Sequence, residues 1–253
     1  MGLLINGVGA GTTATVAAAD ITDSTATGQA LMTAANAAAA RTAIDAAEDG
    51  APPSVTSDAM AGTGFVALTT SGSATFAWSG GKGTGTCPLG SAASCGVEAS
   101  SYLPRGEWYD LAIRVDVVTG DASSLTRLVL TAGQSSAANV STILWTNGTI
   151  EWGSYGSGSF SSLGTTAGPD SGQRTGGELW LRLTRTPTGV AFSWGVGSAG
   201  ALPTTWTTVG VSSAANVLAR AGGTYVSIAV LTTSSFAFTA DILAIKSSLP
   251  GGF

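Results

Sequence analysis

Residue types that usually carry catalysis are scarce in this chain of 253 residues. Histidine is absent, which excludes a His-based catalytic triad, a His general base and a His-ligated zinc. Two cysteines, Cys87 and Cys95, are too few for a zinc site by themselves. Their spacing allows a disulfide that closes a small loop, and the alternative is a pair of free thiols.

The acidic residues are scattered along the chain rather than grouped. Asp110 and Asp116 fall on one face of an expected strand, while Glu151 and Glu178 stand among apolar neighbours. A catalytic pair would have to be assembled by the fold, and solvated surface carboxylates are the simpler interpretation. Clusters of Asp and Asn oxygens, which calcium requires, are missing. We therefore expect no enzymatic activity, no metal and no cofactor.

Aromatic side chains are the remaining candidates for chemistry. An exposed ring can stack on the apolar face of a pyranose while nearby polar groups fix its orientation. The glycan-binding candidates are Tyr155, Trp180, Arg182 and Trp206. Two have competing interpretations, because Trp180 can instead cover a neighbouring strand or an oligomer interface, and Trp206 can lie in the core.

The elements that must position these side chains are β-strands, expected from residue 51 to the C-terminus. Short runs of β-branched and aromatic residues alternate with Gly, Ser and Asn turns. In residues 178–196, a two-residue loop at Pro187-Thr188 places Trp180 and Arg182 on one face. The opposite face then carries three apolar pairs, Leu179 with Val196, Leu181 with Trp194, and Leu183 with Phe192.

A second hairpin is expected in residues 141–155. Its Asn147-Gly148 dipeptide is the strongest short-range signal for a two-residue turn. That turn sets Trp145 opposite Ile150 and Ile143 opposite Trp152. All four side chains are therefore predicted to share one face and to lie in the core.

The N-terminal fifth of the chain differs in composition. Residues 1–20 are rich in glycine and predict an extended arm, and residues 21–50 are rich in alanine and predict a short helical stalk. One copy of this stalk has too few large apolar residues to bury a core, so we expect it to oligomerise. The predicted oligomerisation residues are Leu31, Met32, Ala35, Ala39 and Ile44.

Charge and hydropathy exclude further classes. A net charge of −5 with only 10 Lys plus Arg leaves no basic patch for nucleic acid. Apolar runs do not reach the roughly 18 residues of a membrane span. The start of the chain also lacks the positive region of a secretion signal.

Three stretches resemble the concanavalin A-like lectin/glucanase superfamily: residues 178–185, 204–210 and 236–245. Their strand reading Trp-Leu-Arg-Leu, the Thr-Trp strand and the final Phe-x-x-Asp strand follow in the order typical of that superfamily. The resemblance covers roughly residues 55 to 246 and implies an antiparallel lectin-like β-sandwich, a jelly roll. The Glu-x-Asp-x-x-Glu strand that marks its retaining glucanases is missing.

A second resemblance concerns the stalk. Residues 21–34 and 37–44 are similar to a segment of bacteriophage tail fibres and related virion fibres. This implies a homotrimeric structural protein of the virion: a tail fibre, head fibre, spike or decoration protein. Its N-terminal arm would dock on other virion proteins of head, neck or tail, and its sandwich would attach to host surface glycan. The alternatives are a purely structural decoration protein and a glycan depolymerase.

Overall fold

The computed structural model describes residues 54–56, 65–68, 71–79, 82–89, 92–100, 102–103, 108–120, 126–232 and 236–248. The predicted arm, the stalk with its five oligomerisation residues, and the boundary near residue 50 lie outside these residues. They remain predictions.

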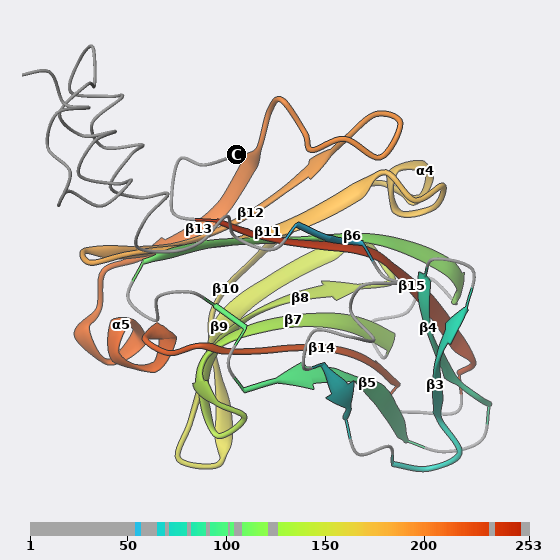
Figure 1. Ribbon diagram of the computed structural model, residues 1–253, viewed down its shortest axis with the longest axis horizontal. Coiled ribbons are helices and arrows are strands. Elements are labelled where there is room, and N and C mark those ends of the chain that lie inside the picture. The colour runs from blue at the N-terminus through green and yellow to red at the C-terminus, as the bar shows by residue number, and fades with distance from the viewer. Residues whose placement is uncertain are drawn as a thin grey trace, which may run out of the picture. The chain divides into compact units, whose positions relative to one another are not determined.

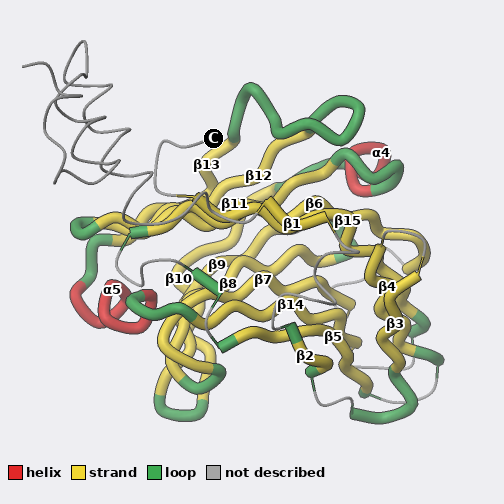
Figure 2. Tube along the Cα trace, viewed as in Figure 1, coloured by secondary structure: helices red, strands yellow, loops and turns green. Residues whose placement is uncertain are grey.

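Two antiparallel β-sheets pack face to face (Figures 1 and 2). The eight-stranded sheet has the order β13 (Thr207–Ser212), β12 (Gly189–Val196), β11 (Leu179–Thr186), β6 (Tyr109–Gly120), β15 (Phe238–Ser248), β4 (Lys82–Cys87) and β3 (Thr75–Ser79), with β1 (Ser54–Thr56) also on β15. The seven-stranded sheet has the order β10 (Ser159–Ala167), β9 (Thr149–Gly156), β8 (Ala138–Trp145), β7 (Thr126–Ser135), β14 (Tyr225–Thr232), β5 (Ala93–Ala99) and β2 (Val66–Ala67).

The core fills the space between the sheets, because alternate residues of each strand point inward. On β6 the inward side chains of Leu111, Ile113 and Val115 are fully buried, and on β14 Val226 and Ile228 are too. Each such side chain contributes about 1.5–3 kcal/mol when it is removed from water. The predicted β-sandwich is confirmed in this part of the chain.

The predicted hairpin at Pro187-Thr188 is also confirmed. Thr186 pairs with Gly189 across the turn, and all three expected apolar pairs form between β11 and β12. Trp180 lies opposite Gly195 on the other face, as the register requires. The two-residue loop therefore fixes both faces of β11.

The hairpin of β8 and β9 differs from its prediction by one residue. Leu144 pairs with Ile150 and Ile143 with Glu151, because the loop has three residues and Gly148 occupies its left-handed position, with φ +88°. Thr146 holds this loop in place, since its backbone N–H donates to the carbonyl of Thr126 at 3.1 Å.

This shift moves side chains from one face of the sheet to the other. Ile150 is in the core and Trp152 packs against it, as predicted. Ile143 and Trp145 were predicted to share that core face, and this was wrong, although Ile143 is only 5% exposed. Both lie on the outward face of the sheet, beside Glu151.

Two short helices occur in the described part of the chain, where none of useful length was expected. Helix α4 (Ser171–Arg174) begins with a capping box formed by Asp170 and Gln173. Helix α5 (Ala215–Ala221) packs at one end of the sandwich against β7, β8, β9 and β12 (Figure 1). Among the described residues, no helix is long and apolar enough to cross a membrane.

Candidate functional site

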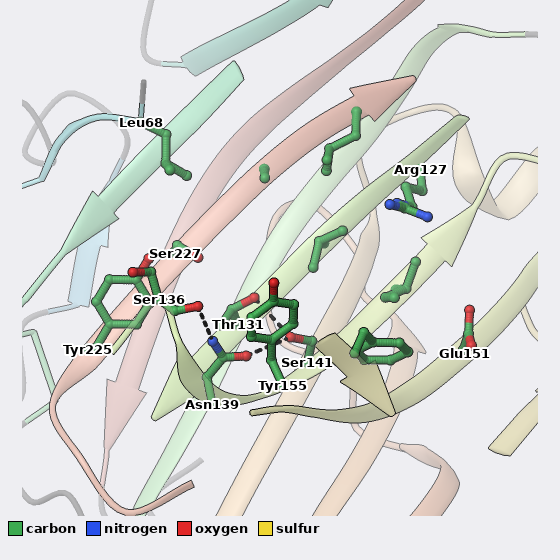
Figure 3. Close-up of a pocket in the computed structure, with 15 residues that line it drawn as sticks. Leu68, Arg127, Thr131, Ser136, Asn139, Ser141, Glu151, Tyr155, Tyr225 and Ser227 are labelled. Carbon is green, nitrogen blue, oxygen red and sulfur yellow. Dashed lines mark hydrogen bonds between the residues drawn. The ribbon is translucent and has the colours of Figure 1, made fainter. Parts of the chain in front are cut away.

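A hollow of about 340 Å³ lies on the outward face of the seven-stranded sheet (Figure 3). Its lining comes from five neighbouring strands together with two loop residues. These are Arg127, Val129 and Thr131 of β7; Asn139, Ser141 and Ile143 of β8; Glu151 and Tyr155 of β9; Phe160 of β10; Tyr225, Ser227, Ala229 and Leu231 of β14; and Leu68 and Ser136.

The strand register arranges this lining in rows that run across the sheet. The middle row pairs Ser227 with Thr131, Thr131 with Ser141, and Ser141 with Gly153. Ser227, Thr131 and Ser141 have small side chains, so the sheet surface stays low where they lie. All three carry hydroxyl groups, which makes the floor of the hollow polar.

Hydrogen bonds fix the floor. Thr131 Oγ1 and Ser141 Oγ lie 3.0 Å apart, and Ser141 Oγ donates to Asn139 Oδ1 at 3.2 Å. The amide nitrogen of Asn139 donates to the carbonyls of Ser135 and Ser136, each at 3.0 Å, and Figure 3 shows the bond to Ser136. Because both ends of the Asn139 amide are engaged, its orientation and that of the two hydroxyls are set before a ligand arrives.

Aromatic side chains stand in the next row. The register runs from Tyr225 through Gly133 and Asn139 to Tyr155, and from Tyr155 to Phe160. Figure 3 shows Tyr225 and Tyr155 on opposite sides of the Asn139 network. The floor is therefore bordered by rings at both ends of this row.

Each ring is held by its surroundings. The Tyr155 hydroxyl donates to the carbonyl of Gly158 at 2.9 Å. The Phe160 ring lies over Gly153, where a Cβ would come within 2.6 Å of the ring. The Tyr225 hydroxyl donates to Glu98 Oε2 at 2.8 Å, and burial raises the pKa of Tyr225 to about 12. These contacts keep the rings in place at low entropic cost.

The opposite end of the hollow is charged. The Arg127 guanidinium lies 4.8 Å from the ring centroid of Trp145, and Trp145 Nε1 donates to Glu151 Oε2 at 3.1 Å. Burial lowers the pKa of Arg127, and the nearby Glu151 carboxylate opposes that shift. Arginine still keeps its proton at neutral pH. This end thus offers one cation and one anion within reach of a ligand.

The four glycan-binding candidates from the sequence do not come together. Tyr155 lines the hollow, whereas Trp180, Arg182 and Trp206 belong to the eight-stranded sheet or the loop beside it. Trp180 has no exposed surface, and the ammonium of Lys246 lies 5.6 Å from its ring centroid. Its ring is therefore not available to stack on a sugar.

Arg182 and Trp206 form a closed group of their own. The Arg182 guanidinium lies 4.8 Å from the Trp206 ring centroid and makes a bidentate ion pair with the fully buried Asp110, including Nε to Oδ1 at 2.6 Å. Thr184 Oγ1 also donates to Asp110 at 2.9 Å. These contacts already engage the groups that would recognise a ligand.

The one-residue error in the β8–β9 register hid the three residues that β8 contributes to the hollow, and the lining residues of β7, β10 and β14 were not among the predicted candidates. With the three-residue loop, Ser141, Ile143 and Trp145 fall on the outward face with Glu151 and Tyr155. The signal that could have revealed this was Glu151 itself. In the predicted register, its carboxylate was placed opposite Leu144, a poor partner for an outward charge.

The remaining residue predictions concern metals and cysteines. Among the described residues, no group of three or more metal-ligating side chains lies close enough to hold an ion. Cys87 and Cys95 are both buried and are free thiols in this structure.

Comparisons with known proteins bear on the fold. The sequence matches no protein-family model and no curated protein. The exoplasmic/lumenal domain of VIP36, solved with Ca²⁺ and Man3GlcNAc bound, is 9% identical with a TM-score of 0.53, over 74% of this chain and 84% of that domain. Its metal-free form gives 10% identity and a TM-score of 0.52 over the same shares.

The structure of a glycosidase is also similar, with a lower TM-score. The GH43 protein BlXynB from Bacillus licheniformis is 14% identical with a TM-score of 0.47, over 67% of this chain. This chain spans about a third of BlXynB, 33% of its length. The VIP36 likeness confirms the predicted fold class: the chain carries an antiparallel, lectin-like β-sandwich.

Proposed function

We propose that this chain is a non-enzymatic protein of a bacteriophage virion whose lectin-like head binds host-surface glycan in the hollow. The observation that carries the glycan proposal is the arrangement of rows on the seven-stranded sheet. A low floor of hydroxyls, fixed by Asn139, lies beside a row of rings that includes Tyr155 and Tyr225. Pyranoses need this combination, because one face is apolar and the edges carry hydroxyls.

The charges favour a neutral sugar. Arg127 and Glu151 are the charged groups among the described residues that line the hollow, and their charges cancel. A guanidinium and a carboxylate side by side can donate to and accept from adjacent hydroxyls. An acidic sugar would meet Glu151 at the same end and would be repelled.

Binding without hydrolysis agrees with the carboxylates of the site. Glycosidases of the common kind need two carboxyl groups about 5–10 Å apart across the scissile bond. Glu151 is the one carboxylate in the described lining, and it accepts a hydrogen bond from Trp145. We therefore favour attachment over depolymerisation.

The virion setting rests on the sequence of the N-terminal segment. Residues 21–34 and 37–44 are similar to bacteriophage fibre segments and cannot bury a core as one copy. In this proposal the stalk makes a homotrimer, and the arm docks on other virion proteins. Light scattering on the full chain tests the trimer, and a monomeric mass would rule it out.

Glycan binding is tested on an array of neutral and acidic oligosaccharides, followed by calorimetry on the best ligand. Tyr155→Ala should weaken binding about tenfold or more through loss of ring contact. Trp206→Ala removes a ring on the other sheet and is the matched control, so it should leave affinity within about twofold. Equal losses in both variants would contradict the site.

The same assay separates the alternatives. A folded protein that binds no glycan on the array would indicate a purely structural decoration protein. Release of reducing ends from host capsule or lipopolysaccharide would establish a depolymerase instead, and would overturn the non-enzymatic proposal.

A further inference from the structure

Two buried thiols lie between the sheets at the end of the sandwich formed by β4 and β5. Cys87 is the last residue of β4 in the eight-stranded sheet, and Cys95 lies in β5 of the seven-stranded sheet. Their exposed fractions are 0% and 1%, and both belong to the hydrophobic core. Each thiol thus faces the opposite sheet across the core.

The contacts of the sulfur atoms bring the two residues together. Cys87 Sγ lies 3.5 Å from the carbonyl oxygen of Ala93, which is on the strand of Cys95. Cys95 Sγ lies 3.9 Å from the carbonyl oxygen of Thr86, the residue before Cys87. Each sulfur therefore lies against the strand that carries the other cysteine. The interaction between the two thiols lowers the pKa of Cys87 and raises the pKa of Cys95.

We propose that Cys87 and Cys95 are a disulfide-forming pair that crosslinks the two sheets of the sandwich. A strand of one sheet would then be covalently joined to a strand of the other, at the end where β4 and β5 meet. Ordinary hairpin disulfides join strands of one sheet, so this bond would have a different effect. It would keep the two sheets from separating at this end.

The oxidant is a low-molecular-weight disulfide such as oxidised glutathione. The Cys87 thiolate attacks one glutathione sulfur, the glutathione S–S bond breaks, and the first glutathione leaves as a thiol after taking a proton. The Cys95 sulfur then attacks Cys87 Sγ, loses its proton to solvent, and releases the second glutathione. The protein loses two hydrogens, and one glutathione disulfide becomes two glutathiones.

Burial decides when this chemistry can occur. A small disulfide cannot reach sulfurs with 0% and 1% exposure unless β4 and β5 separate. The bond should therefore form during folding and resist reduction afterwards. Reduction by dithiothreitol should be at least about tenfold slower in the folded protein than in concentrated urea.

The experiment is refolding of the full chain in glutathione redox buffer, in parallel with refolding in excess reductant. Both samples are unfolded in urea, alkylated with iodoacetamide and digested with trypsin. Lys82 and Arg105 bracket both cysteines without an intervening Lys or Arg, so one peptide reports the pair. In the oxidised sample we expect that peptide to be unalkylated and about 2 Da lighter than the unmodified dithiol peptide. In the reduced sample we expect it to be doubly alkylated.

Every other outcome overturns the proposal. Double alkylation after oxidative refolding would show that the sulfurs do not bond. A stable glutathione adduct on one cysteine, or a peptide dimer from two chains, would show that the pair does not close within the chain. None of these results depends on whether the hollow binds glycan.

Stability provides the second measurement. The oxidised sample should melt roughly 5 °C higher than the reduced one, because the crosslink restricts the unfolded chain. Cys87→Ala is the control and should show no difference between the two redox conditions. If the control shifts equally, the stabilisation does not come from this bond.

Discussion

The outward face of the eight-stranded sheet carries Trp180, Arg182 and Asp110, and that of the seven-stranded sheet carries Tyr155, Ser141 and Arg127. Both faces offer a ring, a cation and hydrogen-bonding groups. On the first, these groups contact one another: Trp180 is buried and Arg182 is paired with Asp110. On the second, a hollow of about 340 Å³ stays open above the same kinds of group. Composition alone therefore does not distinguish a binding face from a structural one.

The difference lies in what covers each sheet. The loop that follows β12 passes close to Trp180, since a Cβ on Gly197 would lie 2.9 Å from its Nε1. That loop leads to Trp206, which stacks on Arg182. On the seven-stranded sheet, the small residues Thr131, Ser141 and Ser227 keep the middle row low, and the hollow lies above it. On the eight-stranded sheet, the loop after β12 covers the outward face. On the seven-stranded sheet, the corresponding space is open to a ligand.

The largest expected effect comes from Trp180→Ala. Removing a fully buried indole should lower the free energy of unfolding by about 3–5 kcal/mol, measured by urea denaturation. Trp206→Ala, at a half-buried ring on the same sheet, is the control and should lose much less. A loss below about 1 kcal/mol for Trp180→Ala would contradict a structural role for this face, since Trp180 would then act as a surface residue.

The ion pair beneath that face gives a second effect. Asp110 is fully buried, and the Arg182 side chain is 17% exposed, so Asp110→Asn should lower the free energy of unfolding by about 2–3 kcal/mol. A double-mutant cycle with Arg182→Met isolates the pair, and we expect a coupling of about 1–3 kcal/mol. Additive losses would show that the two groups act independently.

Ionisation of buried tyrosines gives a smaller, pH-dependent loss of stability. Tyr225 and Tyr102 both have a pKa raised to about 12 by burial, so their neutral forms stabilise the fold below pH ~10. The unfolded chain begins to ionise near pH 10, so each tyrosine loses about 1 kcal/mol of stabilisation by pH 11. The loss is complete once pH has risen through about 12. Tyr225→Phe should flatten the decline in unfolding free energy between pH 9 and 11. An unchanged slope would mean that the Tyr225 ring is not held in the buried position described.

Sequence reasoning recovered the sandwich and one of its two hairpins in full register. The β11–β12 hairpin was predictable because a single loop length satisfies three apolar pairs, Leu179 with Val196, Leu181 with Trp194 and Leu183 with Phe192. The β8–β9 hairpin was not, because either loop length places apolar residues inward: Ile143 with Trp152, or Leu144 with Ile150. A tertiary bond from Thr146 to Thr126 holds the longer loop, and no local pattern reveals it.

Of the four predicted glycan-binding residues, Tyr155 alone lines the hollow. Trp180 and Arg182 were correctly placed on the non-core face, but burial of that face depends on the path of the loop between β12 and β13. This loop contains small and polar residues whose course is set by packing rather than by period. Strand alternation tells which face a side chain occupies, and it does not tell whether something covers that face.

The three-residue loop at 146–148 restricts how this protein can change. Its length helps to set the β8–β9 pairing, and a pairing displaced by one residue would send Ile150 outward and Glu151 into the core. Point substitutions at Thr131, Ser141 and Ser227 alter the hollow without touching the register. Variation in binding preference should therefore accumulate as side-chain replacements on a backbone of constant length. A mutant library built for new ligands should diversify those three positions and leave this loop as it is.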